Sequence, residues 1–330
     1  MLKDTLFSLL SVYGPSGREE AVAARICELL APVNVTVRRD AMGNLIMEKK
    51  GAEDGKIIMF SAHMDHIGLV VTDVEKEGYL RVARVGGIGA DFNTARHVVF
   101  GNGVQGVVIA QPVKEGKPQI NDLFVDIGAQ DRREALQMIS LGDVCVYAPH
   151  IAQLGAHRVS APAMDDRCAC ALLVELLLRA DNPRNTIVAV FSTQEEVGVR
   201  GAEVAAYSVQ PDIGIGLDVT AWGDTPETRI PSVRLGDGVA IKFMDSMMIS
   251  SPVIRDALIH CARENHIPYQ CEVLPFGGTD GAAIQHSRAG VPTCTLSIPC
   301  RYVHSACETI DMRDMSSALD LMLAFVDQEL

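Results

Sequence analysis

The chain has 330 residues, and its 29 Lys and Arg against 42 Asp and Glu give a formal net charge of −13. Hydrophobic residues make up 48% and charged residues 22% of the sequence, close to globular averages, which excludes a disordered or fibrous chain. The acidic residues are spread along the chain, whereas a nucleic-acid-binding protein needs a basic face. No apolar run approaches the roughly 20 residues that cross a bilayer. We therefore expect neither a nucleic-acid partner nor a membrane partner.

Cysteine usage and the amino terminus both favour the cytoplasm. The nine cysteines are scattered and include no Cys-x-x-Cys pair, so we expect reduced thiols in the core rather than a zinc ribbon or a disulfide framework. Asp4 stands where a signal peptide carries positive charge, and the apolar stretch over 6–10 is too short for one. We expect a soluble, cytoplasmic protein.

The first part of the chain predicts a helix followed by strands. Ser16 and Glu19 match a capping box, with Ser16 as the N-cap of a helix whose apolar residues run from Val22 to Leu30. Two strands joined by a Gly-Asn turn are expected over 33–39 and 45–49. A short apolar run over 56–62 is typical of a strand that is buried on both faces of a sheet.

The middle of the chain has a different pattern. Short β-type runs alternate with Gly, Asn, Pro and charged turns, and one helical stretch is expected over 131–140. The predicted strands cover 68–72, 80–85, 97–100, 107–113, 123–126 and 144–147. We interpret this region as a small all-β module, a barrel or a sandwich, inserted into another domain.

After residue 163, helices and strands alternate. Helices are expected over 165–179, 201–209, 252–265, 280–287 and from 316 onward. Strands are expected over 186–192, 213–219, 239–243, 270–274 and 291–298. Alternation at these lengths favours an α/β domain with helices on both faces of a sheet. We divide the chain into a catalytic α/β domain made of 1–67 and 160–330 and an inserted β domain over 68–159.

One glycine motif does not indicate nucleotide binding. Gly101, Gly103 and Gly106 match G-x-G-x-x-G, but the residues that follow are strand-like. Without a helix N-terminus there is no amide cradle for a pyrophosphate. We expect a turn or bulge at this place.

Acidic and histidine residues occur at five strand ends or helix starts in the predicted α/β domain. They are His63 with Asp65, Asp165 with Asp166, Glu195 with Glu196, Asp218, and His304. Each has an ordinary alternative; the adjacent aspartates, for example, could cap a helix. Ligands of open α/β sheets bind where the strands end, so five such sites together favour one shared site. Two His and several carboxylates suit Zn²⁺, Co²⁺ or Mn²⁺, and one carboxylate can bridge two ions about 3.5 Å apart.

These motifs, in this order, resemble the M42 family of metallo-aminopeptidases, which includes glutamyl and deblocking aminopeptidases and the tetrahedral TET peptidases. The resemblance spans nearly the whole chain and includes the β insert. It rests on His63-Met64-Asp65, Asp165-Asp166-Arg167, Glu195-Glu196-x-Gly198, Asp218, Gly277-Gly278-Thr279-Asp280 and Arg301-Tyr302-Val303-His304-Ser305. The chain departs from the family at Ala306-Cys307, where we expect Pro-Val or similar; this position follows the last ligand and concerns loop shape.

The resemblance implies a central mixed sheet flanked by helices, a small inserted β-barrel, and two divalent metal ions per subunit, Zn²⁺ or Co²⁺ with Mn²⁺ possible. Asp165 would bridge the ions through an unusual peptide link to Asp166. His63 and Asp218 would complete one site, and Glu196 and His304 the other.

Further roles also follow from the resemblance. Glu195 would be the general base that takes a proton from the metal-bridged water and passes it to the departing amine. Asp65 would support the ligands, because it can hydrogen-bond the second ring nitrogen of His63. The substrate pocket would be lined by Gly277, Gly278, Thr279 and Asp280. The substrates would be short peptides, and the insert would assemble the subunits into a homododecamer.

Two other functions were weighed. A glycoside hydrolase could use Glu195 and Asp218, but it needs an aromatic-lined cleft, and this chain has 5% aromatic residues with Trp222 as its only Trp. A non-catalytic assembly protein would not need the complete ligand set. Arg301 near His304 could favour acidic substrates, but a structural ion pair explains it equally well.

Overall fold

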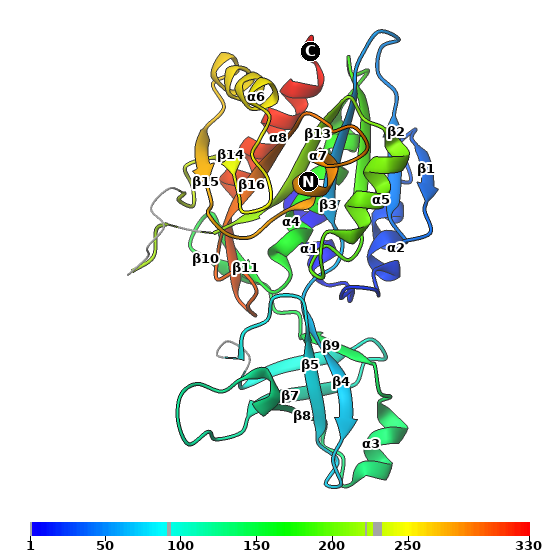
Figure 1. Cartoon of the computed structure of the whole chain (residues 1–330), viewed down its shortest axis with the longest axis vertical. Coiled ribbons are helices and arrows are strands. Elements are labelled where there is room, and N and C mark those ends of the chain that lie inside the picture. The colour runs from blue at the N-terminus through cyan, green and yellow to red at the C-terminus, as the bar shows by residue number, and fades with distance from the viewer. Residues whose placement is uncertain (1, 91–93, 222, 227–232) are drawn as a thin grey trace.

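The computed structural model describes residues 2–90, 94–221, 223–226 and 233–330. Trp222, on which the argument against a glycosidase partly rests, lies outside the described residues. In the described part of the chain the elements form a large mixed sheet with helices and, at one end of the long axis, a closed β-barrel (Figure 1). The predicted fold class, an α/β domain with an inserted barrel, is confirmed.

The large sheet has eleven strands within the described ranges, in the order β1-β2-β12-β3-β13-β16-β17-β11-β10, with β14 and β15 attached beside β16. Four central strands, β12, β3, β13 and β16, run parallel to one another. The strands are β1 (Thr36–Arg39), β2 (Leu45–Lys49), β12 (Thr186–Ser192), β3 (Ile57–His63), β13 (Ile213–Thr220), β16 (Thr293–Arg301), β17 (Glu308–Asp311), β11 (Arg158–Ala161), β10 (Ala152–Leu154), β14 (Val239–Met244) and β15 (Tyr269–Val273).

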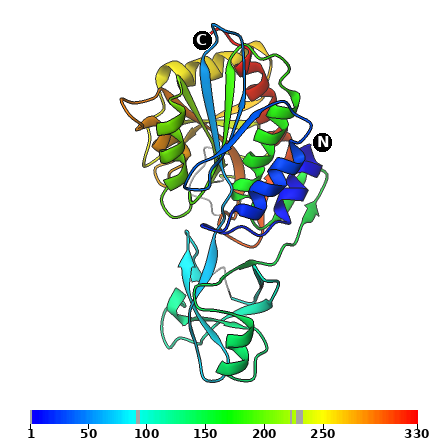
Figure 2. The same cartoon turned by 90° about the vertical axis from the view of Figure 1, so that its right-hand side faces the viewer.

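Helices cover both faces of this sheet (Figure 2). Alternate residues of β12 explain why: Ile187, Ala189 and Phe191 join the larger hydrophobic core, whereas Val188 and Val190 join a smaller one on the opposite face. The larger core contains residues of α1 (Leu2–Leu10), α2 (Glu20–Leu29), α4 (Met164–Arg179), α6 (Pro252–Glu264) and α8 (Met312–Val326). The smaller core contains residues of α5 (Arg200–Val209) and α7 (Asp280–Gln285). The buried apolar runs predicted as strands are therefore covered on both sides.

The inserted module is a closed barrel with its own hydrophobic core. Its strands follow the order β4 (Gly68–Val74), β5 (Leu80–Val85), β8 (Leu123–Asp126), β7 (Gln105–Ala110), β6 (Arg96–Phe100) and β9 (Val144–Tyr147), and α3 (Arg132–Met138) packs beside it. The glycine motif forms the antiparallel turn between β6 and β7, with Gly103 at φ +88°, as expected for a turn. All six predicted barrel strands are present.

Strand pairing also bears on where the insert ends. Strands β10 and β11 pair with each other, and β11 pairs with β17 of the large sheet, although 152–159 were assigned to the insert from the sequence. We propose that the insert runs from Gly68 to Tyr147 and that the chain has re-entered the catalytic domain by β10.

Two local predictions were wrong. The capping box at Ser16 and Glu19 is not formed: α2 begins at Glu20, its N-cap Glu19 makes no side-chain cap, and the Ser16 hydroxyl donates instead to Asp65. The strand predicted over 33–39 begins only at Thr36. In each case the local pattern competes with contacts from distant parts of the chain.

All nine cysteines are free thiols, and six of them are buried: Cys145, Cys168, Cys170, Cys261, Cys294 and Cys300. Among the described residues, no helix is both long and apolar enough to span a bilayer.

Candidate metal centre

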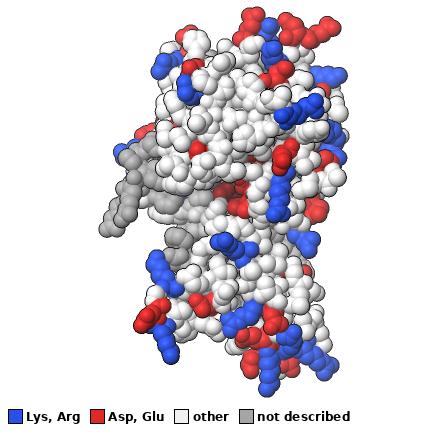
Figure 3. Space-filling model, in the orientation of Figure 1, with Lys and Arg blue, Asp and Glu red and all other residues white. Residues whose placement is uncertain are grey.

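The predicted ligands meet where the parallel strands of the sheet end. His63 is the last residue of β3, Glu195 and Glu196 follow β12, and Asp218 lies near the end of β13. Because these strands are parallel neighbours, their carboxyl ends share one edge. Asp165 comes from the start of α4, and His304 from the loop after β16. In the space-filling view, acidic side chains gather in a hollow between the sheet and the barrel (Figure 3).

Two groups of side chains have the spacing of metal ligands. In His63, Asp165 and Asp218, and again in Asp165, Glu196 and His304, the ligand atoms lie within 4.8 Å of one another. Asp165 belongs to both groups, and each of its oxygens faces a different histidine: Oδ1 is 3.0 Å from His63 Nε2, and Oδ2 is 3.2 Å from His304 Nε2. The peptide bond between Asp165 and Asp166 is cis, which corresponds to the unusual link that the family resemblance implies.

The hydrogen bonds of the two histidines make this donor set fit cations. His63 Nδ1 lies 2.9 Å from the carbonyl of Asp65, and His304 Nδ1 lies 3.1 Å from the carbonyl of Gly87. Since a carbonyl oxygen only accepts, each Nδ1 carries a proton, and each Nε2 faces carboxylates; a cation bound there would take the place of a proton on Nε2. Asp165 Oδ1 and Glu196 Oε1 are buried without a hydrogen-bond partner. A divalent cation in each group would satisfy these atoms.

The density of negative charge also alters the pKa values at the centre. Burial lowers the pKa of His304, but its hydrogen bonds to Asp165 and Glu196 outweigh burial and raise that pKa to about 12. Burial raises the pKa of Asp218 well above its usual value, and the charge of Asp165 adds to this effect. Several carboxylates are therefore held together at a cost that a cation would offset.

Glu195 belongs to neither ligand group, although it is next to Glu196. Its Oε2 lies 4.0 Å from His63 Nε2, and its side chain is 13% exposed. Burial raises the pKa of Glu195 well above its usual value, His63 opposes this shift, and Asp218 adds to it. A carboxyl group that is free of the ligand groups, partly exposed and easily protonated is suited to proton transfer.

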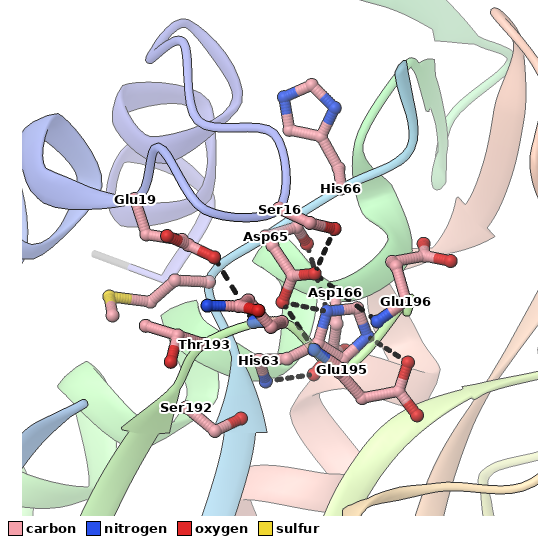
Figure 4. A network of polar contacts seen from close by, with 12 residues as sticks. Ser16, Glu19, His63, Asp65, His66, Asp166, Ser192, Thr193, Glu195 and Glu196 are labelled. Carbon is pink, nitrogen blue, oxygen red and sulfur yellow. Dashed lines mark hydrogen bonds and ion pairs between the residues drawn. The ribbon is translucent and has the colours of Figure 1, made fainter. Parts of the chain in front are cut away.

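Asp65 holds the loop that carries both glutamates. Its carboxylate accepts hydrogen bonds from the amides of Glu195 (3.0 Å) and Glu196 (3.2 Å) and from the Ser16 hydroxyl (2.6 Å), as Figure 4 shows. The expectation that its side chain bonds the ring of His63 was wrong: the main-chain carbonyl of Asp65 makes that bond, and its carboxylate lies 3.6 Å from Nδ1. Asp165 and Asp166 do not act as simple helix caps: the oxygens of Asp165 face the two histidines, and Asp166 Oδ2 accepts a hydrogen bond from the amide of His63 at the end of β3.

A cavity of about 460 Å³ opens beside the ligands. Asp165, Asp218 and His304 contribute to its lining, and so do three of the four predicted pocket residues, Gly277, Gly278 and Thr279. Asp280 is buried elsewhere, and its Oδ2 accepts hydrogen bonds from Ser61 (2.6 Å) and Ser192. Gly277 has φ +71°, and a Cβ on Gly278 would overlap the side chain of Met247.

Several contributing residues were not predicted from the sequence. Glu308 is buried, and its carboxylate accepts hydrogen bonds from the amides of His304 (2.7 Å) and Asp165 (3.1 Å). Burial, with the charge of Asp165, raises the pKa of Glu308 to about 8. Glu19 accepts a hydrogen bond from the amide of Gln194 and so supports the same loop as Asp65. The sequence offered one weak signal for each role: Glu308 is an acidic residue at the start of a strand, and Glu19 belongs to the motif that was predicted as a capping box.

Arg301 has a structural role. Its guanidinium forms a two-point ion pair with Asp224, at 2.9 Å and 2.6 Å. The structure therefore contains the structural ion pair that was one of the two interpretations of Arg301; the other was the binding of acidic substrates.

Comparisons with known proteins agree with this geometry. The model of the M42 glutamyl aminopeptidase family matches residues 43–321. A lysyl aminopeptidase of Pyrococcus furiosus is 34% identical, and the match covers 96% of this chain and 94% of that protein.

Two solved structures are similar over almost the whole chain. An aminopeptidase from Desulfurococcus kamchatkensis has a TM-score of 0.95 at 34% identity, covering 99% of this chain and 95% of that one. The Pyrococcus horikoshii TET1 peptidase, described as assembling into a tetrahedron or a large octahedral shell, has a TM-score of 0.88 at 32% identity, covering all of both chains. The chain therefore belongs to the M42 family of metal-dependent aminopeptidases, as its motifs predicted.

Proposed function

We propose that this chain is a two-metal aminopeptidase that removes the N-terminal residue from short peptides. The observation that carries the proposal is the carboxylate of Asp165, whose two oxygens face two different histidines within two overlapping ligand groups. His63, Asp165 and Asp218 would hold one ion, and Asp165, Glu196 and His304 the other. This borderline set of nitrogen and oxygen donors suits Zn²⁺ or Co²⁺, and also accommodates Mn²⁺.

The remaining chemistry falls to Glu195. Divalent ions, when bound, would lower the pKa of a water molecule and polarise the scissile carbonyl. Glu195 takes a proton from the attacking water at a carboxylate oxygen and passes it to the departing amine. The main-chain amides of Glu195 and Glu196 each donate a hydrogen bond to the carboxylate of Asp65, which holds this loop so that Glu196 can bind a cation while Glu195 stays free. Gly277, Gly278 and Thr279 would border the substrate, whereas Asp280 would support the site through Ser61 and Ser192.

The adjacent glutamates provide a matched test. We expect Glu195→Gln to reduce kcat by at least about a hundredfold while the protein retains its metal, because only proton transfer is removed. Glu196→Gln, the same chemical change one residue away, should lose metal from one site. Activity on aminoacyl chromogenic substrates and metal content by mass spectrometry are measured for both, before and after EDTA and after Co²⁺ or Zn²⁺ is restored. Activity that is insensitive to chelation would contradict the proposal, and loss of metal from Glu195→Gln would mean that base and ligand are exchanged.

We also propose that the chain forms a homododecamer through its barrel. The support is its similarity over full length to a TET peptidase that assembles into a tetrahedron. Sedimentation should then give twelve times the subunit mass of 35.6 kDa. A monomer or dimer at micromolar concentration, with full peptidase activity, would contradict this assembly.

The cytoplasm is the compartment that we propose. Nine cysteines without a disulfide, most of them buried, suit a reducing environment.

A further inference from the structure

The cavity beside the metal centre has mostly apolar walls and one buried cation. Val219, Leu274, Phe276 and Val303 contribute apolar surface. Among the described residues that line it, Lys242 is the only ionisable side chain outside the ligand groups. A lysine in such a pocket would ordinarily attract an acidic substrate side chain.

Lys242, however, is already paired with two buried carboxylates. Its Nζ lies 2.9 Å from Glu272 Oε1 and 3.5 Å from Asp245 Oδ2, and all three side chains are at most 1% exposed. The hydroxyl of Thr220, another lining residue, donates to Glu272 at 2.6 Å. Burial lowers the pKa of Lys242, but the charges of Glu272 and Asp245 outweigh burial and raise it above its usual value. Lys242 is therefore a charged partner of two carboxylates.

The charges of this cluster do not cancel. One ammonium and two carboxylates sum to about −1, and Glu272 Oε2 and Asp245 Oδ2 have no hydrogen-bond partner. An acidic side chain entering the cavity would meet a lysine whose charge is already more than compensated. A basic side chain would meet the cationic residue Lys242, which lines the cavity, whereas Glu272 and Asp245 are not among its lining residues. The cavity therefore disfavours both acidic and basic substrate side chains, and its apolar walls favour an apolar one.

We propose that this cavity selects an uncharged, apolar N-terminal residue and that Glu272 and Asp245 are specificity-determining residues that keep Lys242 from binding acidic substrates. The inference rests on the proposed aminopeptidase function and names the substrate class of that same site. Arg301, which precedes His304 by three residues, is held by Asp224 and does not change this balance.

The unmodified enzyme gives the first test. Its kcat/KM is measured on Leu, Met, Glu and Lys 4-nitroanilides with metal supplied. We expect Leu and Met to exceed Glu and Lys by at least about tenfold, the usual range for discrimination in an apolar pocket. A preference for Glu or for Lys would overturn the inference while leaving the aminopeptidase function intact. No activity on any substrate after metal is restored would instead contradict the proposed function.

Two substitutions that remove the same charge give the second test. Glu272→Gln and Asp245→Asn each keep the side-chain shape and remove one negative charge beside Lys242. We expect each to lower the ratio of kcat/KM for Leu over Glu substrates by about tenfold. Glu264→Gln neutralises an exposed carboxylate at the end of α6 and should leave the ratio unchanged. An unchanged ratio in whichever of the two variants folds would overturn the role of the cluster.

Discussion

Asp165 and His304 come from different parts of the chain, and one side chain sets their separation. Glu308 accepts a hydrogen bond from the main-chain amide of each, so its two oxygens join the start of α4 to the loop after β16. Both ligands carry backbone angles that local sequence does not enforce: Asp165 lies in a non-helical part of α4, and His304 has φ +62°. A buried carboxylate with two amide donors stabilises such a geometry because it cannot easily exchange them for water.

His66, close to the centre but outside both ligand groups, predicts a pH dependence of stability. Burial, together with the charge of Arg167, lowers the pKa of His66 from 6.5 to about 3. Between these values the unfolded chain binds a proton that the folded protein does not. The stability contributed by the neutral ring is therefore fully present above about pH 6.5 and is lost as pH falls towards about 3.

We expect His66→Asn to remove this dependence, because an amide can still donate to the carbonyl of Ile67 but does not titrate. Denaturant unfolding at several pH values below about 6 gives the slope of the unfolding free energy against pH. That slope should be smaller in the variant by at most about 1.4 kcal/mol per pH unit, the value for one proton. Both proteins are kept in EDTA so that metal binding does not contribute. Parallel slopes for the two proteins would show that His66 is not the titrating group.

At the scale of elements, most of the site could be predicted because the central strands are regular. β3, β12 and β13 are buried on both faces, and such strands are recognisable as short apolar runs in which an acid or histidine at the end stands out. Once these strands are parallel neighbours, the three ends must meet at one edge. The inference from local pattern to a shared site therefore needed no knowledge of side-chain contacts.

The elements that escaped prediction depend on distant partners. β10, β11 and β17 are short, and each is a strand because of what it pairs with rather than because of its own composition. Ser16 has the residues of a capping box, but its hydroxyl is more strongly engaged by Asp65, a residue 49 positions away. Arg167 shows the same dependence: its buried guanidinium donates to the carbonyls of Leu9 and Met64, which fixes the N-terminal segment against β3. Such contacts between residues far apart in the chain cannot be predicted from the local sequence.

At the scale of the whole molecule, the inserted barrel contacts the candidate metal centre. The loop after β5 brings Gly86 and Gly87 against the ligands, and the carbonyl of Gly87 accepts the hydrogen bond from His304 Nδ1. That bond fixes which ring nitrogen of His304 is left for a cation. The barrel therefore orients one ligand of the sheet domain, and a change in the barrel can be transmitted to the metal centre.

This coupling predicts the effect of a single methyl group. A Cβ on Gly87 would lie 2.6 Å from Nδ1 of His304, so Gly87→Ala must displace the imidazole ring or its partner carbonyl. We expect Gly87→Ala to weaken binding of one metal ion by about 10- to 100-fold, the usual cost of disturbing an oriented ligand, and to reduce activity in parallel. Calorimetric titration of the metal-free protein measures the affinity, and circular dichroism checks the fold.

Gly116→Ala is the control: it lies in another barrel loop at φ +77° with open space around its Cβ, so it strains the barrel without touching His304. Both substitutions can destabilise the barrel. A loss of metal affinity in Gly87→Ala but not in Gly116→Ala would therefore show that the barrel acts through His304. Equal metal affinities in the two variants would contradict this coupling.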